Sequence, residues 1–129
     1  MVRALLLALC LLWNSAGAEP YKAKTVLSFS KELNLSADQR GQIGQALKEL
    51  RNQLVQCQQR NATLQKAAND LLRAHAPLPQ IRRKFEEMSA IEVDAKMVDI
   101  STARKIQEIL TAEQFERWKT IQAKNGASL

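Results

Sequence analysis

Apolar positions in the middle of the chain recur at alternating steps of four and three residues, which is typical of a long helix with one apolar seam. The seam consists of Ile43, Leu47, Leu50, Leu54, Cys57, Asn61, Leu64, Ala68 and Leu71, and Asn61 is its only polar member. The pattern predicts a helix from Ser36 to about Ala74, roughly 57 Å long at 1.5 Å per residue. Because this exceeds the width of a small domain, the seam requires a hairpin partner, a second subunit, or both.

A break and a second long helix follow. Ala76-Pro77-Leu78-Pro79 ends the first helix, because proline lacks a backbone donor and disfavours helix in the residue before it. The next helix is predicted from about Pro79 to Ile109. Its main apolar face consists of Ile81, Phe85, Met88, Ile91, Ala95, Val98, Ile106 and Ile109.

A second apolar stripe lies nearly opposite this main face. At about 100° per residue, Val93, Met97 and Ile100 fall on the far side of the same helix. A helix with two apolar faces buries one and offers the other to something else. This second face is covered either by the first or last helix of the chain or by a bound protein, for which a flexible methionine is well suited. The basic residues on or beside this side are Arg82, Arg83 and Arg104.

Two short segments repeat one pattern, a leucine followed by a hydroxyl residue and, three positions later, a glutamine. The residues that define them are Leu35, Ser36 and Gln39, and then Leu110, Thr111 and Gln114. This is the spacing of a capping box, in which the hydroxyl and the glutamine satisfy backbone N–H groups at a helix start. The pattern therefore predicts that helices begin at both places.

The remaining elements are short. Residues 25–33 predict a first helix, and the second box opens a last helix from Ala112 to about Ala123, ending near Asn125-Gly126. No run alternates as a strand would. The expected fold is all-α, with four helices, of which the two long ones form a hairpin.

The chain begins as a secretory signal peptide does. Arg3 precedes an apolar run to Trp13, and Ala16-Gly17-Ala18 is a cleavage signal, so cleavage is expected after Ala18. Residues 1–18 are thus assigned to the signal peptide and 19–129 to a single domain. Cys10 raises a lipoprotein alternative, which we set aside because the cysteine lies inside the apolar run. No other segment is apolar enough to cross a membrane.

The formal net charge is +6. Nucleic acid is not the expected partner, because the basic residues are interleaved with glutamates and lack an aromatic stacking set. An anionic membrane surface or acidic unfolded proteins fit better, and a solvated helix surface is the plainer explanation. There is no phosphate loop, nucleophile elbow or Cys/His pair, so neither enzyme activity nor a cofactor is expected.

Cys57 and Asn61 occupy neighbouring seam positions. Cys57 is interpreted as a small buried apolar residue or as one half of a disulfide between subunits. Asn61 is interpreted as a residue that fixes the register of paired helices, or as one that points partly to solvent. The predicted dimer seam is Leu47, Leu50, Leu54, Cys57 and Asn61.

Two Leu-[Ser/Thr]-x-x-Gln boxes in a small, exported, helical chain resemble the Spy/CpxP family of bacterial periplasmic proteins. The second box matches the family's Leu-Thr-x-x-Gln pattern fully, and the first has Ser36 in place of threonine. The resemblance covers residues 22–124. It implies a periplasmic location and a cradle-shaped antiparallel homodimer in which two long hairpins wrap around each other.

The resemblance implies an ATP-independent chaperone that binds unfolded or misfolded envelope proteins on a basic, patchily apolar surface. The stripe and arginines named above are its expected client-binding residues. One alternative is a regulator that binds the periplasmic domain of an envelope-stress sensor kinase. Another is a metal-responsive protein, as in zinc-associated and nickel/cobalt-sensing relatives. Because their sites are rich in histidine and this chain has only His75, no metal ligand is assigned. No stable membrane insertion is expected.

Overall fold

The protein is described by a computed structural model covering residues 24–125. Within this range the chain forms one 3-10 helix, η3 (Val26–Phe29), and three α-helices, α2 (Ala37–Arg73), α3 (Leu78–Ile109) and α4 (Ala112–Asn125). The expected all-α fold is confirmed. The predicted signal peptide, its predicted cleavage site and the predicted helix stop at Gly126 lie outside the described residues.

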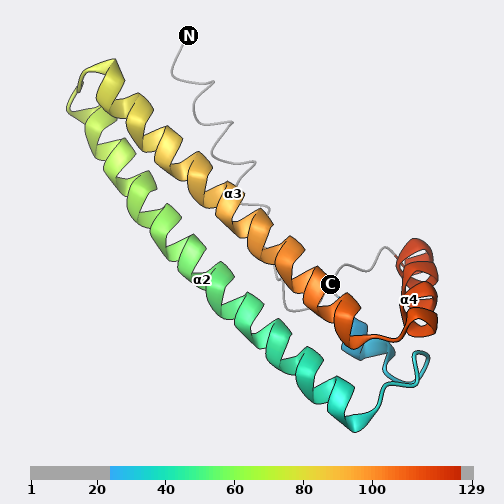
Figure 1. Ribbon diagram of the computed structural model, residues 1–129. Helices are drawn as coiled ribbons and strands as arrows, with labels where there is room; N and C mark the ends of the chain where they lie inside the picture. Colours follow the sequence, from blue (N-terminus) through green and yellow to red (C-terminus); the bar gives the residue numbers. More distant parts are fainter. Residues whose placement is uncertain (1–23, 126–129) are drawn as a thin grey trace.

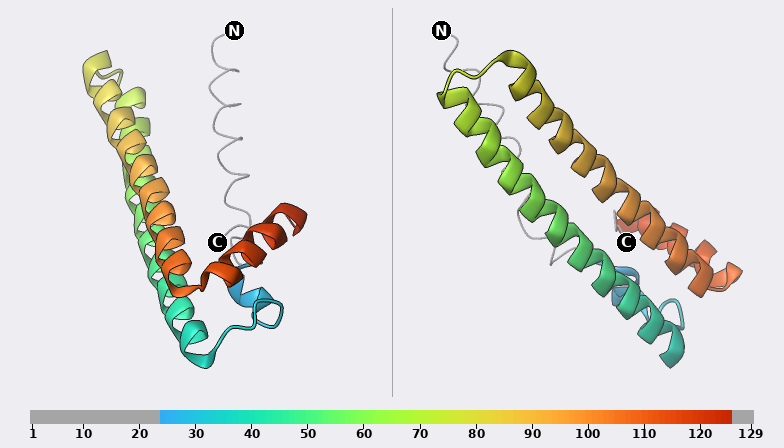
Figure 2. Two further views of the ribbon diagram at one scale, coloured as in Figure 1. Left: turned by 45° about the vertical axis from the view of Figure 1, so that its right-hand side comes forward. Right: turned by 60° about the vertical axis from the view of Figure 1, so that its left-hand side comes forward.

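Helices α2 and α3 form a long antiparallel hairpin, and η3 and α4 fold against the end where α2 begins and α3 ends (Figure 1). The 37 residues of α2 correspond to about 55 Å. In the left view of Figure 2, α4 projects away from this end. Of the described residues, the opposite end carries the turn between the long helices. We call these two ends the base and the tip of the hairpin.

The first predicted helix, over residues 25–33, is wrong in type, because it forms the four-residue 3-10 helix η3 and then a turn. Local hydroxyl bonds compete with an α-helical ladder there: the Thr25 N–H donates to Ser28 Oγ at 3.2 Å, and Ser30 Oγ donates to the Leu27 carbonyl at 2.6 Å. Asn34, at φ 52°, then turns the chain out of the segment. So short a segment also cannot offset the cost of nucleating an α-helix.

The main core lies at the base. Its buried members are Val26, Leu33, Leu35, Ile43, Ala46, Ile106, Leu110 and Trp118. Trp118 of α4 is only 2% exposed, and its ring centroid lies 5.8 Å from that of Phe29. Burial of an indole of this size ties η3 and α4 to the base. Towards the tip, the described part of the chain contributes only contacts between α2 and α3.

Two ion pairs across the hairpin define its register. Lys105 Nζ lies 3.4 Å from Glu49 Oε2, and Arg60 Nη1 lies 3.7 Å from Asp94 Oδ2. A step of eleven residues forward along α2 therefore matches a step of eleven residues back along α3. All four side chains are about half exposed. Because water screens such pairs, they mark the register of the hairpin but contribute little to its stability.

Two positions on the main face of α3 differ from the sequence prediction. Phe85, predicted on this face, is 44% exposed, because it lies towards the tip, where no third element within residues 24–125 covers it. Thr102, which the apolar pattern skipped, is buried at 6% exposure. Its hydroxyl donates to the Val98 carbonyl at 2.9 Å, and this bond allows a polar residue to occupy a core position.

The tip is a tight turn of the kind that ends helices with a left-handed residue. His75 has φ 51°, its N–H donates to the Leu72 carbonyl at 3.2 Å, and the Ala76 N–H donates to the Leu71 carbonyl at 3.0 Å. These bonds satisfy carbonyls at the end of α2. Pro77 then precedes α3, as the sequence break predicted. None of the described helices combines the length and hydropathy needed to cross a bilayer.

Candidate functional site

Both capping boxes form as predicted. In the first, the Gln39 N–H donates to Ser36 Oγ at 3.1 Å, and the Ser36 N–H donates to Gln39 Oε1 at 3.0 Å. In the second, the Gln114 N–H donates to Thr111 Oγ1 at 3.2 Å, and the Thr111 N–H donates to Gln114 Oε1 at 2.9 Å. The boxes therefore start α2 and α4 in the same way.

The two boxes also meet in space. Gln39 Nε2 donates to Gln114 Oε1 at 2.7 Å, and Gln114 Nε2 donates back to Gln39 Oε1 at 3.1 Å. We call this reciprocal amide pair the glutamine clasp. Gln39 Nε2 also donates to the Ile109 carbonyl at 3.0 Å, at the end of α3. The clasp thus joins the starts of α2 and α4 to the end of α3.

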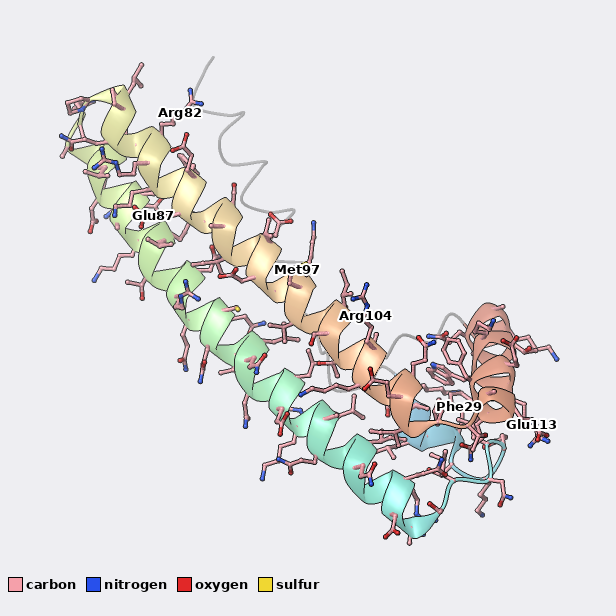
Figure 3. All side chains as sticks on the ribbon, viewed as in Figure 1. Phe29, Arg82, Glu87, Met97, Arg104 and Glu113 are labelled. Atoms are coloured by element: carbon pink, nitrogen blue, oxygen red, sulfur yellow. The ribbon has the colours of Figure 1, made fainter. Side chains whose placement is uncertain are left out.

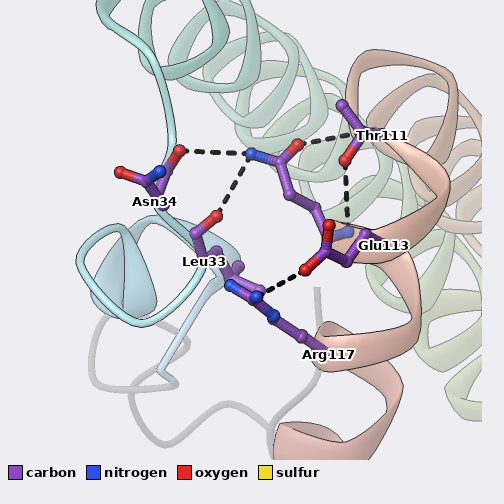
Figure 4. A network of polar contacts seen from close by, with 6 residues as sticks. Leu33, Asn34, Thr111, Glu113 and Arg117 are labelled. Atoms are coloured by element: carbon purple, nitrogen blue, oxygen red, sulfur yellow. Dashed lines mark hydrogen bonds and ion pairs between the residues drawn. The ribbon is translucent and has the colours of Figure 1, made fainter.

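Gln114 extends the clasp to the segment before α2. Its Nε2 donates to the Leu33 carbonyl at 3.1 Å and to the Asn34 carbonyl at 3.3 Å (Figure 4). Nearby, Arg117 pairs with Glu113 along the exposed side of α4. Because both glutamines donate as well as accept, glutamate cannot replace them here, although an ordinary capping box accepts either residue. The boxes therefore organise the base.

The exposed stripe of α3 is the most distinctive feature of the described surface. Val93, Met97 and Ile100 are 58%, 56% and 46% exposed. Neither η3 nor α4 covers them, so the interpretation that the first or the last helix buries the stripe is wrong. In Figure 3, Met97 lies between Arg82 and Arg104 along the edge of α3 that faces away from α2. The sequence prediction had placed these side chains on one side, and the structure does so too.

The three predicted arginines are distributed unevenly around the stripe. Arg104 follows Ile100 by one helical turn, and it forms no ion pair within residues 24–125. Arg82 lies about 16 Å from Val93 along the helix axis, near the tip. Arg83 is turned by about 100° from Arg82 and faces the side of the hairpin. Arg104 is thus the arginine closest to the stripe.

Arg82 is held by a neighbour on its own helix. Its Nε donates to Glu86 Oε1 at 2.8 Å, and this bond raises the pKa of the Arg82 guanidinium further above its ordinary range. The pair is exposed to water and joins residues one turn apart, so it changes the stability of the helix little. It leaves Glu86 as an acidic neighbour of the tip end of the stripe.

The predicted dimer seam is covered within one chain. Leu50 is buried, and the other four members (Leu47, Leu54, Cys57 and Asn61) are half-buried. Helix α3 therefore supplies the hairpin partner that the seam of α2 requires. Cys57 is a free thiol, and Asn61 Oδ1 is buried without a hydrogen-bond partner among the described residues.

A groove that the sequence analysis missed runs along one side of the hairpin between α2 and α3. It has two sections, of about 650 Å³ nearer the base and about 320 Å³ nearer the middle. Glu49 and Lys105 lie between the sections and line both. Met97 lines the second section, so the groove opens beside the stripe. Its other lining residues are both polar and apolar. Only the register of the hairpin, which the seam alone did not fix, brings them together.

The surroundings lower the pKa of Glu49, which lines this groove. Side-chain hydrogen bonds from Gln45 and from Lys105, together with the charge of Lys105, lower the pKa of the Glu49 carboxyl below 4.5. The carboxylate is therefore charged at neutral pH. Within residues 24–125, no three His, Cys, Asp or Glu side chains gather closely enough to hold a metal ion.

Comparison with known proteins does not assign a family. No protein-family model matches the chain, and neither a curated protein nor a solved structure shows significant similarity to it.

Proposed function

We propose that this chain is a Spy/CpxP-like periplasmic chaperone that binds unfolded or misfolded envelope proteins without ATP. The observation that carries the proposal is the exposed stripe of Val93, Met97 and Ile100 on α3. Three large apolar side chains, each about half exposed, lie in one line on a rigid helix. Exposed apolar groups gathered in this way mark interaction surfaces in soluble proteins.

The chemistry of the stripe favours many weak partners over one tight partner. Met97 has a flexible, polarizable side chain that adapts to differently shaped apolar groups. Arg104 places a positive charge one turn from Ile100, where it attracts acidic segments, and its aliphatic stem adds apolar surface. An unfolded chain exposes both kinds of group. Once the client folds, its apolar groups are hidden, so release requires no nucleotide.

We further propose that the chain acts as a homodimer with an antiparallel, cradle-like arrangement. The hairpin is long and thin, and Phe85 of α3, outside the stripe, remains 44% exposed. A second hairpin would cover this side chain and leave the stripe free. Sedimentation equilibrium of the purified protein tests this directly, and a monomer at micromolar concentration would contradict it.

The test of function is suppression of aggregation. The protein, without nucleotide or metal, is mixed at a near-equimolar ratio with two unrelated denatured clients, and light scattering is followed. We expect suppression of both. We expect Val93→Asp with Met97→Asp to abolish it while helicity stays intact. The matched control is Asn52→Asp with Gln59→Asp, which adds the same charge at exposed positions of α2 and should leave suppression unchanged.

The remaining outcomes separate the alternatives. Suppression by the stripe variant at the wild-type level would exclude the stripe as the client surface. No suppression by a folded wild-type protein would favour a regulator that binds one sensor-kinase domain, and that interaction should be saturable and sensitive to salt. Titration calorimetry with zinc, copper and nickel tests the metal-responsive alternative, which predicts binding that this proposal does not.

A further inference from the structure

The hairpin tip carries a second exposed apolar group, distant from the stripe. Leu78, in the first turn of α3, is 79% exposed, more than any other large apolar side chain of the described residues. Leu72, in the last turn of α2, is 40% exposed. Between them the turn contributes the exposed Pro77, while Pro79 follows Leu78. Leu72, Pro77 and Leu78 therefore form a small solvent-exposed apolar cap at the tip of the hairpin.

The cap is held in place by the turn and not by side-chain packing. The two backbone bonds around His75 fix the path of the chain between the helices. Leu78 follows this turn as the first residue of α3. The tip is also the part of the hairpin farthest from the core at the base (Figure 1). It therefore presents its apolar side chains at a protruding end of the molecule.

Positive charge surrounds this cap. From residue 71 to residue 85 the chain contains four basic side chains and no acidic one: Arg73, Arg82, Arg83 and Lys84. Three acidic residues flank this segment: Asp70, Glu86 and Glu87. Arg82 pairs with Glu86, and Lys84 pairs with Glu87. Arg73 and Arg83 form no ion pair within residues 24–125. The positive end of the α3 dipole lies at the same place.

We propose that the hairpin tip docks on the surface of a bilayer that contains anionic phospholipid. In this arrangement Leu78 and Leu72 enter the interfacial layer, and Arg73 and Arg83 contact the headgroup phosphates. A protruding apolar cap ringed by arginines matches a flat, soft, negative surface. The contact is peripheral, because only one turn is involved and none of the described helices can span a membrane. The proposal goes beyond the proposed function and does not use the stripe.

The test is co-sedimentation of the purified protein with sonicated vesicles. The protein is used in the form that the cell exports. One preparation contains phosphatidylglycerol and phosphatidylethanolamine, and the other contains phosphatidylcholine alone. We expect binding to the first, weakened by salt, and several-fold less binding to the second. Failure to bind the anionic vesicles, or equal binding to both, would overturn the proposal.

Two pairs of variants locate the contact. Leu78→Asp should reduce binding at least about fivefold, because it removes apolar surface and adds a negative charge. Aspartate is favourable in the first turn of a helix, so α3 should remain folded, which circular dichroism checks. Val55→Asp makes the same change of charge at an exposed apolar site of α2 and should bind as the wild type does. Wild-type binding by Leu78→Asp would overturn the proposal.

The basic contribution is tested in the same way. Arg73→Gln with Arg83→Gln should lower anionic-vesicle binding several-fold, whereas Arg40→Gln with Lys48→Gln, near the base, should not. Equal losses in the two double variants would show attraction by net charge alone and would overturn docking by the tip. The chaperone proposal is tested separately, because Leu78→Asp should still suppress aggregation, and the stripe variant should still bind vesicles.

Discussion

The side-chain amides of Gln39 and Gln114 bond to each other in both directions, at 2.7 Å and 3.1 Å, although the residues are 75 positions apart. Each amide oxygen also accepts the backbone N–H of its own capping residue, Ser36 or Thr111. One contact thus combines two helix caps with the tertiary arrangement of the base. Stability of the base and correct starts of α2 and α4 are therefore coupled.

The first prediction concerns glutamate at the clasp. Gln114→Glu should lower the free energy of unfolding by about 1–3 kcal/mol, because the carboxylate keeps the cap but cannot donate to Gln39, Leu33 or Asn34. Urea denaturation measures this change. Were Gln114 only an ordinary cap, glutamate near the start of α4 would be neutral or stabilising. An unchanged or higher stability would therefore contradict the clasp.

A double-mutant cycle measures the coupling itself. Gln39→Ala and Gln114→Ala should show a non-additivity of about 0.5–3 kcal/mol, the range expected for side chains in one hydrogen-bond network. Gln58→Ala, at an exposed position of α2, is the control and should change stability by no more than about 0.5 kcal/mol. Additive effects at Gln39 and Gln114 would mean that the two amides act independently.

Asn61 provides a prediction in the opposite direction. Its Oδ1 is buried without a partner among the described residues, so Asn61→Leu should raise the free energy of unfolding by about 1–2 kcal/mol. Asn52→Leu, at an exposed position on the same helix, should not. A less stable Asn61→Leu protein would show that the amide is satisfied in solution. A second set of amide resonances in that variant would assign Asn61 a role in fixing the register.

His75 occupies a backbone conformation that suits glycine. At φ 51° a side chain with a Cβ is strained, so His75→Gly should stabilise the protein by about 0.5–1 kcal/mol. The control is Ala74→Gly, one residue earlier at φ −79°, where glycine only adds freedom to the unfolded chain. Thermal unfolding should move the two variants in opposite directions. Equal shifts would contradict a special role for the turn.

The ion pair between Glu49 and Lys105 can be followed by titration. Hydrogen bonds from Gln45 and Lys105 lower the pKa of the Glu49 carboxyl in the folded protein, so its stabilising effect is present above about pH 4.5 and is lost as pH falls through the folded-state value. In Lys105→Gln, the pKa of Glu49, measured by carbon NMR, should rise towards 4.5. No rise would show that Lys105 does not approach this carboxylate in solution.

Much of the fold is predictable from local signals. The boundaries of α2 and α3 follow from the apolar seam, the capping residues and the prolines, and they agree with the structure to within about one residue. The short first helix failed because hydroxyl bonds within residues 25–30 outweigh a weak helical pattern. The exposure of Phe85 depends on which elements reach the tip, and a periodic pattern does not contain that information.

The site was predictable in part. The stripe of Val93, Met97 and Ile100 follows from helical periodicity, but its exposure depends on where α4 folds, which only the structure shows. The meeting of the two boxes had one signal in the sequence: glutamine at both positions where glutamate would cap equally well. The groove at Glu49 and Lys105 had none, because it arises from the register of the hairpin.

The central claim is that α3 binds unfolded protein through its exposed stripe, and methyl NMR tests it most directly. The methyl resonances of Val93, Met97 and Ile100 are recorded while a permanently unfolded client is added, with Val55 as an equally apolar and nearly equally exposed reference on α2. We predict shifts or broadening at all three stripe residues and little change at Val55. Unchanged stripe resonances, or a response confined to Val55, would contradict the account.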